Sequence, residues 1–262
     1  MIESSQNAAI KAIRRVSRER ESEAVLEGPH LVLEALRLGL RLQPVLATEE
    51  FIASAEGQQV LAGLPRPPLL AASRILAELA DADSPRGLLA VCRLPRAGLE
   101  AVVPGENDLW LFLDRIQDPG NLGALARVAE GLGAQGLLLS PGCADPNHSR
   151  ALRASAGSLL RVPLAVFVEP AAARAHFSSV GSRWIGLDAH KGSLQLDELE
   201  PGGAVILALG AEGKGLSEST RAQLDARVTI PVRGRLESLN VAVAAALVLA
   251  RLVPLVPPIT PP

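Results

Sequence analysis

Three polar segments in the second half of the chain each follow an apolar stretch and contain residue types that could hold a ligand. DPGNLGALAR carries Asn121 and Arg127, LGAEGKG carries Glu212 between glycines, and PVRGRLESLN ends with Ser238 and Asn240. In parallel α/β sheets, ligands bind outside the carboxyl ends of the strands. The positions of these segments therefore predict a site built from amide, carboxylate, hydroxyl and guanidinium groups.

The same residues also have structural interpretations. Asn121 and one of the pair Ser238 and Asn240 could cap helices, since Asn and Ser are favoured at N-caps. One cap leaves the other member of that pair unexplained, because neither residue is followed by the Glu or Gln of a capping box. Arg127 leans back toward Gly123, and its position fits a surface arginine as well as a buried guanidinium that needs acceptors.

The glycines match neither of two common nucleotide-binding patterns. The first segment lacks the GxGxxG spacing of dinucleotide-binding folds. The second has Ala208 and Gly215 where a Walker A loop requires Gly and then Ser or Thr. Gly210, Gly213 and Gly215 still allow the backbone to approach a ligand closely. A small-molecule nucleotide-binding enzyme is therefore disfavoured.

The elements that must position these segments are apolar strands separated by helical segments. We expect strands at 109–114, 136–140, 164–168, 183–188, 204–210 and 227–232. Their hydrophobicity is continuous rather than alternating, which is typical of parallel strands buried on both faces by helices.

An earlier region also alternates helix and strand signals, beginning with a helix over 7–21 and ending with a strand over 87–94. The segment LPRAGLEAVVPGEND mixes proline, glycine and charge, which is typical of a linker. We therefore expect an amino-terminal domain over 1–95, a linker over 96–107 and a second domain over 108–262. A proline-rich tail begins at about residue 254.

The charge distribution leaves one local patch as a nucleic-acid candidate. The net charge is −2, so the chain is not a globally basic protein. Lys11, Arg14, Arg15 and Arg18 share one face of the first helix. Spacing alone favours a solvated face, and a phosphate-contacting face is the alternative. Aromatic residues make up 2% of the chain, which argues against rows of stacked bases.

Several other classes are disfavoured by composition. Hydrophobic residues make up 48% of the 262 residues, as expected for a globular protein. Cys92 and Cys143 have no CxxC spacing and the histidines are scattered, so no metal site is expected. The apolar run from Val241 to Ala250 is too short to span a membrane, and no secretory signal is visible. These features predict a cytoplasmic protein.

In order and spacing, the three polar segments resemble the three motifs of the SpoU (TrmH-type) RNA 2′-O-methyltransferases of the SPOUT superfamily. DPGNLGALARVAEGLG is similar to the first motif, LGAEGKGLS to the second and IPVRGRLESLNVAVA to the third. DPNHSRALRASAGSLLRVPL, which contains Arg153, is similar to the stretch between motifs. SSQNAAIKAIRRV, VLEGPHLVLEAL and SPRGLLAV resemble the ribosomal-protein-like substrate-binding domain of the rRNA-modifying branch.

The resemblance implies an α/β fold: a carboxy-terminal SPOUT domain with a parallel sheet and a deep trefoil knot, preceded by a smaller ribosomal-protein-like α/β RNA-binding domain. It implies S-adenosylmethionine as cofactor, bound by loops that carry Gly210, Ile230, Pro231 and Leu239. It also implies a homodimer through the catalytic domain, with the apolar helix from Val241 at or near the two-fold interface.

The resemblance also assigns roles. Arg127 corresponds to the essential arginine, which we expect to stabilise a developing alkoxide on the ribose. The residues expected to orient that guanidinium and the substrate are Asn121, Glu212, Ser238 and Asn240. The residues expected to contact RNA are Lys11, Arg14, Arg15, Arg18 and Arg153. Two departures from the family pattern are Val232, often Met, and Ala242, often Ser.

The implied activity is 2′-O-ribose methylation of RNA, with large-subunit (23S) rRNA as the expected substrate because of the extra amino-terminal domain. Methylation of tRNA is one alternative. A non-catalytic RNA-binding ribosome-assembly factor is another, and the intact set of catalytic side chains argues against it.

Overall fold

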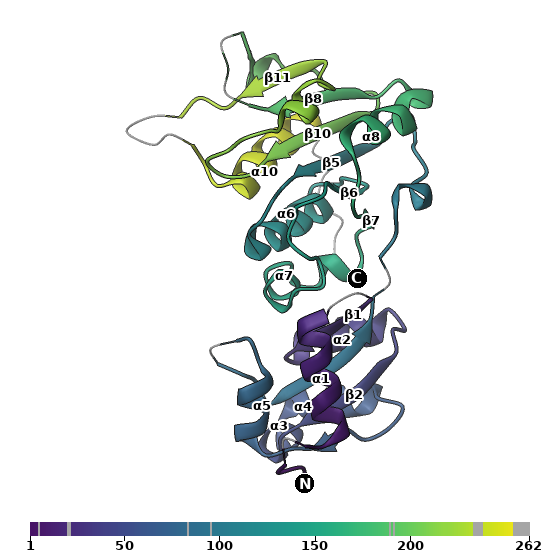
Figure 1. Cartoon of the computed structure of the whole chain (residues 1–262), viewed down its shortest axis with the longest axis vertical. Helices are drawn as coiled ribbons and strands as arrows, with labels where there is room; N and C mark the ends of the chain where they lie inside the picture. Colours follow the sequence, from purple (N-terminus) through teal and green to yellow (C-terminus); the bar gives the residue numbers. More distant parts are fainter. Residues whose placement is uncertain are drawn as a thin grey trace. The chain divides into compact units, whose positions relative to one another are not determined.

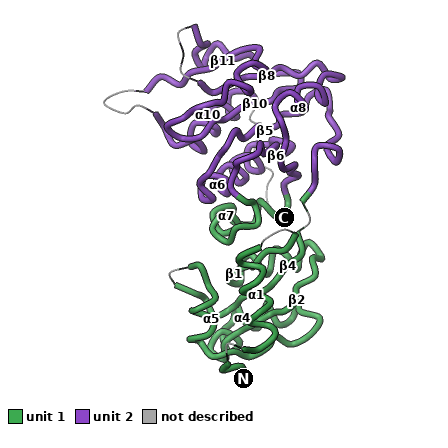
Figure 2. The backbone as a smooth tube through the Cα atoms, in the orientation of Figure 1, with its two compact units in different colours: residues 1–96, 145–161 green, residues 97–144, 162–262 purple. Residues whose placement is uncertain are grey.

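The structure, a computed structural model, describes residues 1–4, 6–19, 22–82, 84–94, 96–188, 190, 192–232 and 238–253. It divides into two compact units: unit 1 contains residues 1–96 and 145–161, and unit 2 contains residues 97–144 and 162–262 (Figure 2). Residues 145–161, placed by sequence in the second domain, thus pack with unit 1. Residues 233–237 of the third polar segment and the proline-rich tail from 254 lie outside the described residues.

Unit 1 is built around a four-stranded sheet of order β1-β4-β2-β3, with α1 packed against it (Figure 1). β4 pairs antiparallel with both β1 and β2, and β3 pairs parallel with β2. Its strands are β1 (Glu23–Glu27), β2 (Leu42–Ala47), β3 (Leu69–Leu70) and β4 (Leu88–Arg93). Its α-helices are α1 (Ala8–Glu19), α2 (Pro29–Arg37), α3 (Glu49–Ala53), α4 (Ala55–Gly63), α5 (Ser73–Leu79) and α7 (Ser149–Ala154).

The predicted amphipathic helix is α1, and its apolar face packs on this sheet. Ile10, Ile13 and Val16 are all buried, in one cluster with Val25 of β1 and Leu89 of β4. Full burial of a side chain of this size contributes about 1.5–3 kcal/mol. The 3.6-residue period of the apolar positions therefore fixes which face of α1 turns inward and leaves its basic face outside.

Two short helices, α3 and α4, were not predicted because neither has a long apolar period. Each begins at a hydroxyl cap: Thr48 Oγ1 accepts from Phe51 N at 3.1 Å, and Ser54 Oγ accepts from Gly57 N at 3.0 Å. Such caps stabilise a helix by about 1 kcal/mol. The signal was present in the sequence as Thr or Ser followed by glutamate.

Unit 2 contains a seven-stranded sheet of order β7-β6-β5-β10-β8-β11-β9, and every pair in it is parallel. The expected parallel sheet is confirmed. Its strands are β5 (Leu109–Asp114), β6 (Gly136–Leu139), β7 (Leu164–Ala165), β8 (Arg183–Leu187), β9 (Leu194–Gln195), β10 (Val205–Gly210) and β11 (Ala226–Thr229). Its α-helices are α6 (Pro119–Gly131), α8 (Pro170–His176), α9 (Glu218–Arg221) and α10 (Val241–Leu252).

Both faces of the central strands are buried, which explains their continuous hydrophobicity. All six residues of β5 are buried. Trp110 and Phe112 of β5 face a cluster with Phe177 and Trp184, and the ring centroids of Phe112 and Trp184 lie 5.4 Å apart. Helices α6 and α10 pack against each other, and α10 also contacts β10.

Two predicted strands are shorter than expected. The run over 164–168 is a regular strand only at Leu164 and Ala165, because Phe167 has a left-handed backbone with φ 57° that interrupts it. The run over 227–232 ends as a strand at Thr229, and Pro231 in this run has no N–H for a ladder hydrogen bond. Both differences place non-strand backbone at the carboxyl edge of the sheet.

The buried thiol of Cys92 in β4 makes stability depend on pH. Burial raises the pKa of Cys92 from its ordinary 9.0 to about 11. The contribution of Cys92 to stability is therefore fully present below pH 9.0 and is lost as the pH rises toward 11, because the unfolded thiol ionises while the native one keeps its proton. The expected loss is about 2–3 kcal/mol. The chain has no tyrosine and only three lysines, and burial also raises the pKa of the second thiol, Cys143, so Cys143 is the main other side chain of this kind that titrates there.

Denaturant unfolding across this alkaline range checks the prediction. Cys92→Ala should be less stable near neutral pH but flatter in its pH dependence than the native chain, since the titrating group is gone. If the free energy of unfolding fell equally with pH in both proteins, Cys92 would not be the group that causes the alkaline loss of stability.

Candidate functional site

A cavity of about 500 Å³ opens at the carboxyl ends of β8, β10 and β11. Its volume lies within the range usual for small-ligand sites. All four residues predicted to bind a cofactor line it: Gly210, Ile230, Pro231 and Leu239. Predicted catalytic residues Glu212 and Ser238 line it too. The structure therefore brings the second and third sequence segments to one cavity.

The glycine-rich turn after β10 is tight because of its backbone. A Cβ on Gly210 would lie 2.2 Å from the carbonyl carbon of Gly215. Gly213 and Gly215 have φ of 76° and 63°, in the left-handed region that favours glycine. Gly215 N donates to Ala211 O at 2.8 Å. Glycines without side chains therefore line this side of the cavity, and Glu212 lies in the turn between them.

Asn121, Glu212 and Asn240 form a closed set of hydrogen bonds. Glu212 Oε1 accepts from Asn121 Nδ2 at 3.0 Å and from Asn240 Nδ2 at 3.1 Å. Asn240 Nδ2 also donates to Asn121 Oδ1 at 2.9 Å. One residue from each of the three sequence segments therefore meets at one point.

The two asparagines differ in their relation to helices. Asn240 Oδ1 accepts from Ala242 N at 3.0 Å and so caps α10 while its Nδ2 bonds the network. The proposed cap role of Asn121 is wrong: Asp118 caps α6, and its Oδ1 accepts from Asn121 N at 2.9 Å. The side chain of Asn121 is free for Glu212 because Asp118 supplies the cap.

Arg127 is not brought into this network. It lies exposed on α6, and in the described part of the chain its guanidinium makes no hydrogen bond or ion pair. The interpretation as a buried arginine is wrong, and the surface interpretation of its position holds. Its five N–H donors are available to a ligand.

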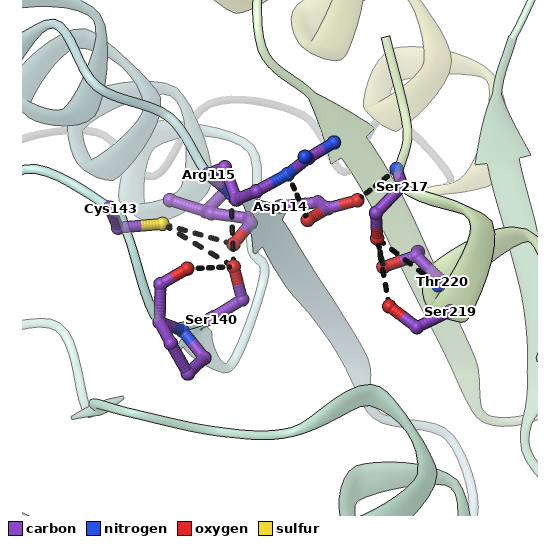
Figure 3. Close-up of polar contacts among 9 residues, drawn as sticks. Asp114, Arg115, Ser140, Cys143, Ser217, Ser219 and Thr220 are labelled. Carbon is purple, nitrogen blue, oxygen red and sulfur yellow. Dashed lines mark hydrogen bonds and ion pairs between the residues drawn. The ribbon is translucent and has the colours of Figure 1, made fainter.

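Two carboxylates that sequence reasoning missed stand at the ends of β5 and β8, the two strands that flank β10. Asp188 follows β8, lines the cavity and pairs with Arg221 of α9 at 2.9 Å, which raises the pKa of that arginine. Asp114 ends β5 almost fully buried and accepts from Ser217 N at 2.5 Å (Figure 3). Both carboxylates hold α9 and its preceding turn. Each is the polar residue that ends an apolar strand, a signal that the sequence contained.

The predicted RNA-contacting side chains lie in unit 1, and several are already paired. On α1, Arg14 pairs with Glu78 at 3.4 Å and Arg15 with Glu23 at 2.7 Å. Lys11 and Arg18 of the same face are exposed. Nearby carboxylates therefore reduce the net charge of this face.

Arg153, the fifth predicted RNA contact, is also held within unit 1. It pairs with Glu27 at 2.7 Å and with Asp81 at 3.1 Å, and its side chain is 29% exposed. Burial raises the pKa of Glu27, whose carboxylate is nearly inaccessible. These ion pairs stabilise the packing of α7 on β1, whether or not Arg153 also contacts RNA.

Among the described residues no three His, Cys, Asp or Glu side chains are grouped to hold a metal ion. In the same part of the chain no helix is long and apolar enough to cross a membrane.

Unit 2 has a parallel sheet with a ligand-sized cavity at its carboxyl edge, and unit 1 is a smaller α/β unit. Together they define a two-unit α/β ligand-binding protein. Residues 108–250 match the SpoU rRNA Methylase family, and residues 7–90 match the MRM3-like substrate binding domain. The chain therefore belongs to the SpoU methyltransferase family, whose cofactor is S-adenosylmethionine.

Known proteins resemble the chain over nearly its whole length or over part of it. An uncharacterized tRNA/rRNA methyltransferase of Synechocystis is 30% identical, covering 95% of this chain and 91% of that protein. One from Mycobacterium sp. strain KMS is 40% identical over 58% of this chain and 48% of its own length. The structure of the SpoU methyltransferase AviRb from Streptomyces viridochromogenes with AdoMet has TM-score 0.82 and 25% identity, covering 94% of this chain and 97% of that one.

The double role of Asn240 makes a prediction that separates capping from the network. Asn240→Asp keeps the cap oxygen but removes the Nδ2 donor and places a second carboxylate beside Glu212. We expect thermal stability to change by less than about 1 kcal/mol, the usual worth of a cap, while methyl transfer falls at least tenfold. Asn240→Ala should lose both the stabilisation from the helix cap and the methyl-transfer activity. If Asn240→Asp were as active as the native protein, the Asn240 Nδ2 hydrogen bonds to Asn121 and Glu212 would not be needed for methyl transfer.

Proposed function

We propose that the protein transfers a methyl group from S-adenosylmethionine to a ribose 2′-oxygen of RNA, with large-subunit rRNA as the substrate. The observation that carries this proposal is the closed set of Asn121, Glu212 and Asn240 beside a cavity lined by Gly210 and Leu239. The three motifs of the resembling family supply one side chain each to this set. A related solved structure, 28% identical with TM-score 0.81, is an RNA 2′-O ribose methyltransferase.

The cavity fits the proposed cofactor in chemistry. Leu187, Val228, Ile230 and Leu239 give it an apolar lining suited to an adenine ring. Asp188 and Glu212 supply negative charge, which suits a sulfonium and an ammonium group. In this proposal the chain around the cavity forms the deep trefoil knot expected from the family. S-adenosylmethionine supplies an activated methyl on a positively charged sulfur.

The residues around the reacting ribose have separate tasks in this proposal. Arg127, exposed and without a partner in the described chain, donates N–H groups to the 2′-oxygen as it gains negative charge. Asn121, Glu212 and Asn240 position the ribose or the guanidinium through their hydrogen-bonded set, and Ser238 adds a hydroxyl at the cavity. Holding the two reacting atoms in line also lowers the barrier, because the entropy of bringing them together is lost on binding rather than in the reaction.

Unit 1 supports rRNA over tRNA as the substrate. Residues 7–90 match a substrate binding domain, and α1 there exposes Lys11 and Arg18. We propose that α1, with Arg14, Arg15 and Arg153, contacts RNA phosphates, and that domains over 1–95 and 108–262 divide binding from chemistry. Methylation of tRNA is the second candidate, since the relatives are described as tRNA/rRNA methyltransferases. We propose a cytoplasmic location for this RNA-modifying activity.

We propose that two copies pair through α10. Val243 and Leu247 are 52% and 41% exposed although α10 is apolar until Arg251. They stand four residues apart, on one helix face. Changing both to glutamate should give a folded monomer with reduced activity, measured by sedimentation and methyl transfer. Val103→Glu, at a site 84% exposed, is the matched control and should remain dimeric. A native monomer would contradict the proposal.

Mapping of ribose methylation in cells with and without the protein tests the substrate. The proposal expects one 2′-O-methyl group to disappear from large-subunit rRNA when the protein is absent. Loss of a tRNA methyl group instead would favour the second candidate. An unchanged map of both RNAs would contradict ribose methylation.

A further inference from the structure

Phe167 is the one aromatic side chain that the described protein exposes. The chain has four Phe, two Trp and no Tyr. Phe167 is 68% exposed, whereas the other five aromatic residues are at most 8% exposed. A single exposed apolar side chain is common on protein surfaces. What sets Phe167 apart is the backbone that turns it outward.

The backbone of Phe167 is fixed in a left-handed conformation from both sides. Its φ is 57°, a region that bulky L-residues rarely adopt. Val166 N donates to Ala97 O at 3.0 Å, and Val168 N donates to Leu139 O at 2.9 Å. These bonds continue pairing on either side of Phe167. Unfavourable backbone that its surroundings enforce is concentrated at functional sites.

Arg115 repeats this arrangement two strands away, after β5. Its φ is 56°, and its N donates to Ser140 Oγ at 2.9 Å (Figure 3). Its side chain is 41% exposed and its Nε donates to Asp114 at 3.3 Å. Its terminal amino groups make no hydrogen bond to any described residue. They are available to an acceptor outside the chain.

The turn after β6 lies between these two side chains. β6 lies between β5 and β7, and its carboxyl end leads into the exposed residues Pro141 and Gly142. A Cβ on Gly142 would lie 3.5 Å from Arg115 Cγ, so its absence keeps this turn close to the arginine. Two strand spacings separate β5 from β7 by about 10 Å. On the other side of β5 lies β10, whose following turn carries Glu212.

We propose that Phe167 and Arg115 form a subsite for single-stranded RNA beside the target nucleotide. Phe167 stacks on one unpaired base, and the terminal amino groups of Arg115 bind a phosphate on the way to the Glu212 network. Stacking on a single aromatic face tolerates any base, so this subsite holds the strand rather than reading its sequence. The inference rests on the proposed function, because it assumes an RNA substrate at this edge of the sheet.

Substitutions at Phe167 distinguish stacking from simple apolar contact. Phe167→Leu keeps an apolar side chain and should raise the KM for large-subunit rRNA, and the Kd for a short single-stranded RNA, by roughly tenfold. Phe167→Trp should stay within about twofold of the native values because it keeps an aromatic face. The kcat at saturating RNA and the Kd for S-adenosylmethionine should not change. Val103→Ala is the control for an exposed apolar side chain.

Arg115→Gln tests the phosphate contact. The slope of log Kd against log salt for the short RNA should decrease by about 0.7, the value for one phosphate contact to a single strand. Native-like RNA binding by both Phe167→Leu and Arg115→Gln would overturn the subsite. A Phe167→Leu protein that changes only in sedimentation would show a protein contact instead and would also overturn it. If the native protein binds the short RNA but transfers no methyl group to any RNA, the proposed function fails. The Kd values of the variants for the short RNA still test the subsite.

Discussion

Arg127→Ala is expected to lower the rate of methyl transfer by about 10²–10³-fold, the usual cost of removing one donor to a developing oxyanion. Arg127 is exposed and makes no hydrogen bond or ion pair to any described residue, so its removal breaks no contact of the fold. The Kd for S-adenosylmethionine and the melting temperature should therefore stay near their native values. Single-turnover rates with saturating RNA and cofactor measure the effect on the chemical step.

Two further variants sharpen this result. Arg127→Lys keeps the charge but loses the planar set of N–H donors, so it should recover only part of the rate. Arg66→Ala removes another exposed arginine, in unit 1, and should retain the native rate. If Arg127→Ala turned over at the native rate, Arg127 would have no part in the mechanism.

The second large effect is expected at Gly210. Its new Cβ in Gly210→Ala would lie 2.2 Å from the carbonyl carbon of Gly215 and 2.4 Å from Leu216 N, both of them backbone atoms. Since no flexible side chain can move aside, the turn that carries Glu212 must shift. We expect at least a tenfold loss of affinity for S-adenosylmethionine, measured by calorimetric titration, and a lower melting temperature.

Gly131→Ala is the matched control. Gly131 lies in α6, has no positive φ and would place its Cβ in open space. Alanine there should leave cofactor affinity unchanged and stabilise the helix by up to about 1 kcal/mol. Native cofactor affinity in Gly210→Ala would mean that the cavity beside this turn does not hold the cofactor.

The parallel sheet and most of the candidate site could be predicted from the sequence. Continuous apolar runs such as 109–114 predicted strands covered on both faces, and β5 is buried throughout. The polar segments after such runs led to Glu212 and Asn240, which do meet. This worked because the carboxyl ends of parallel strands share one edge, so position along the chain implies position in space.

Other features depend on contacts that no local pattern encodes. Asp118 and Asn121 are both good caps by residue type, and only the geometry shows that Asp118 takes that role. The packing of residues 145–161 with unit 1 includes Arg153 pairing with Glu27, 126 positions away in sequence. Phe167 stood inside an apolar run, and its outward turn depends on hydrogen bonds to two separate segments. The strand order of the sheet likewise follows from tertiary packing.

The central claim is that this chain methylates a ribose 2′-oxygen of RNA. The purified protein, incubated with methyl-labelled S-adenosylmethionine and unmodified large-subunit rRNA, followed by digestion to nucleosides and chromatography, tests it most directly. We expect the label to appear in a single 2′-O-methylated nucleoside, and Arg127→Ala to slow its appearance by about 10²–10³-fold. Label in a base-methylated nucleoside, or no transfer to RNA by a protein that binds the cofactor, would contradict it.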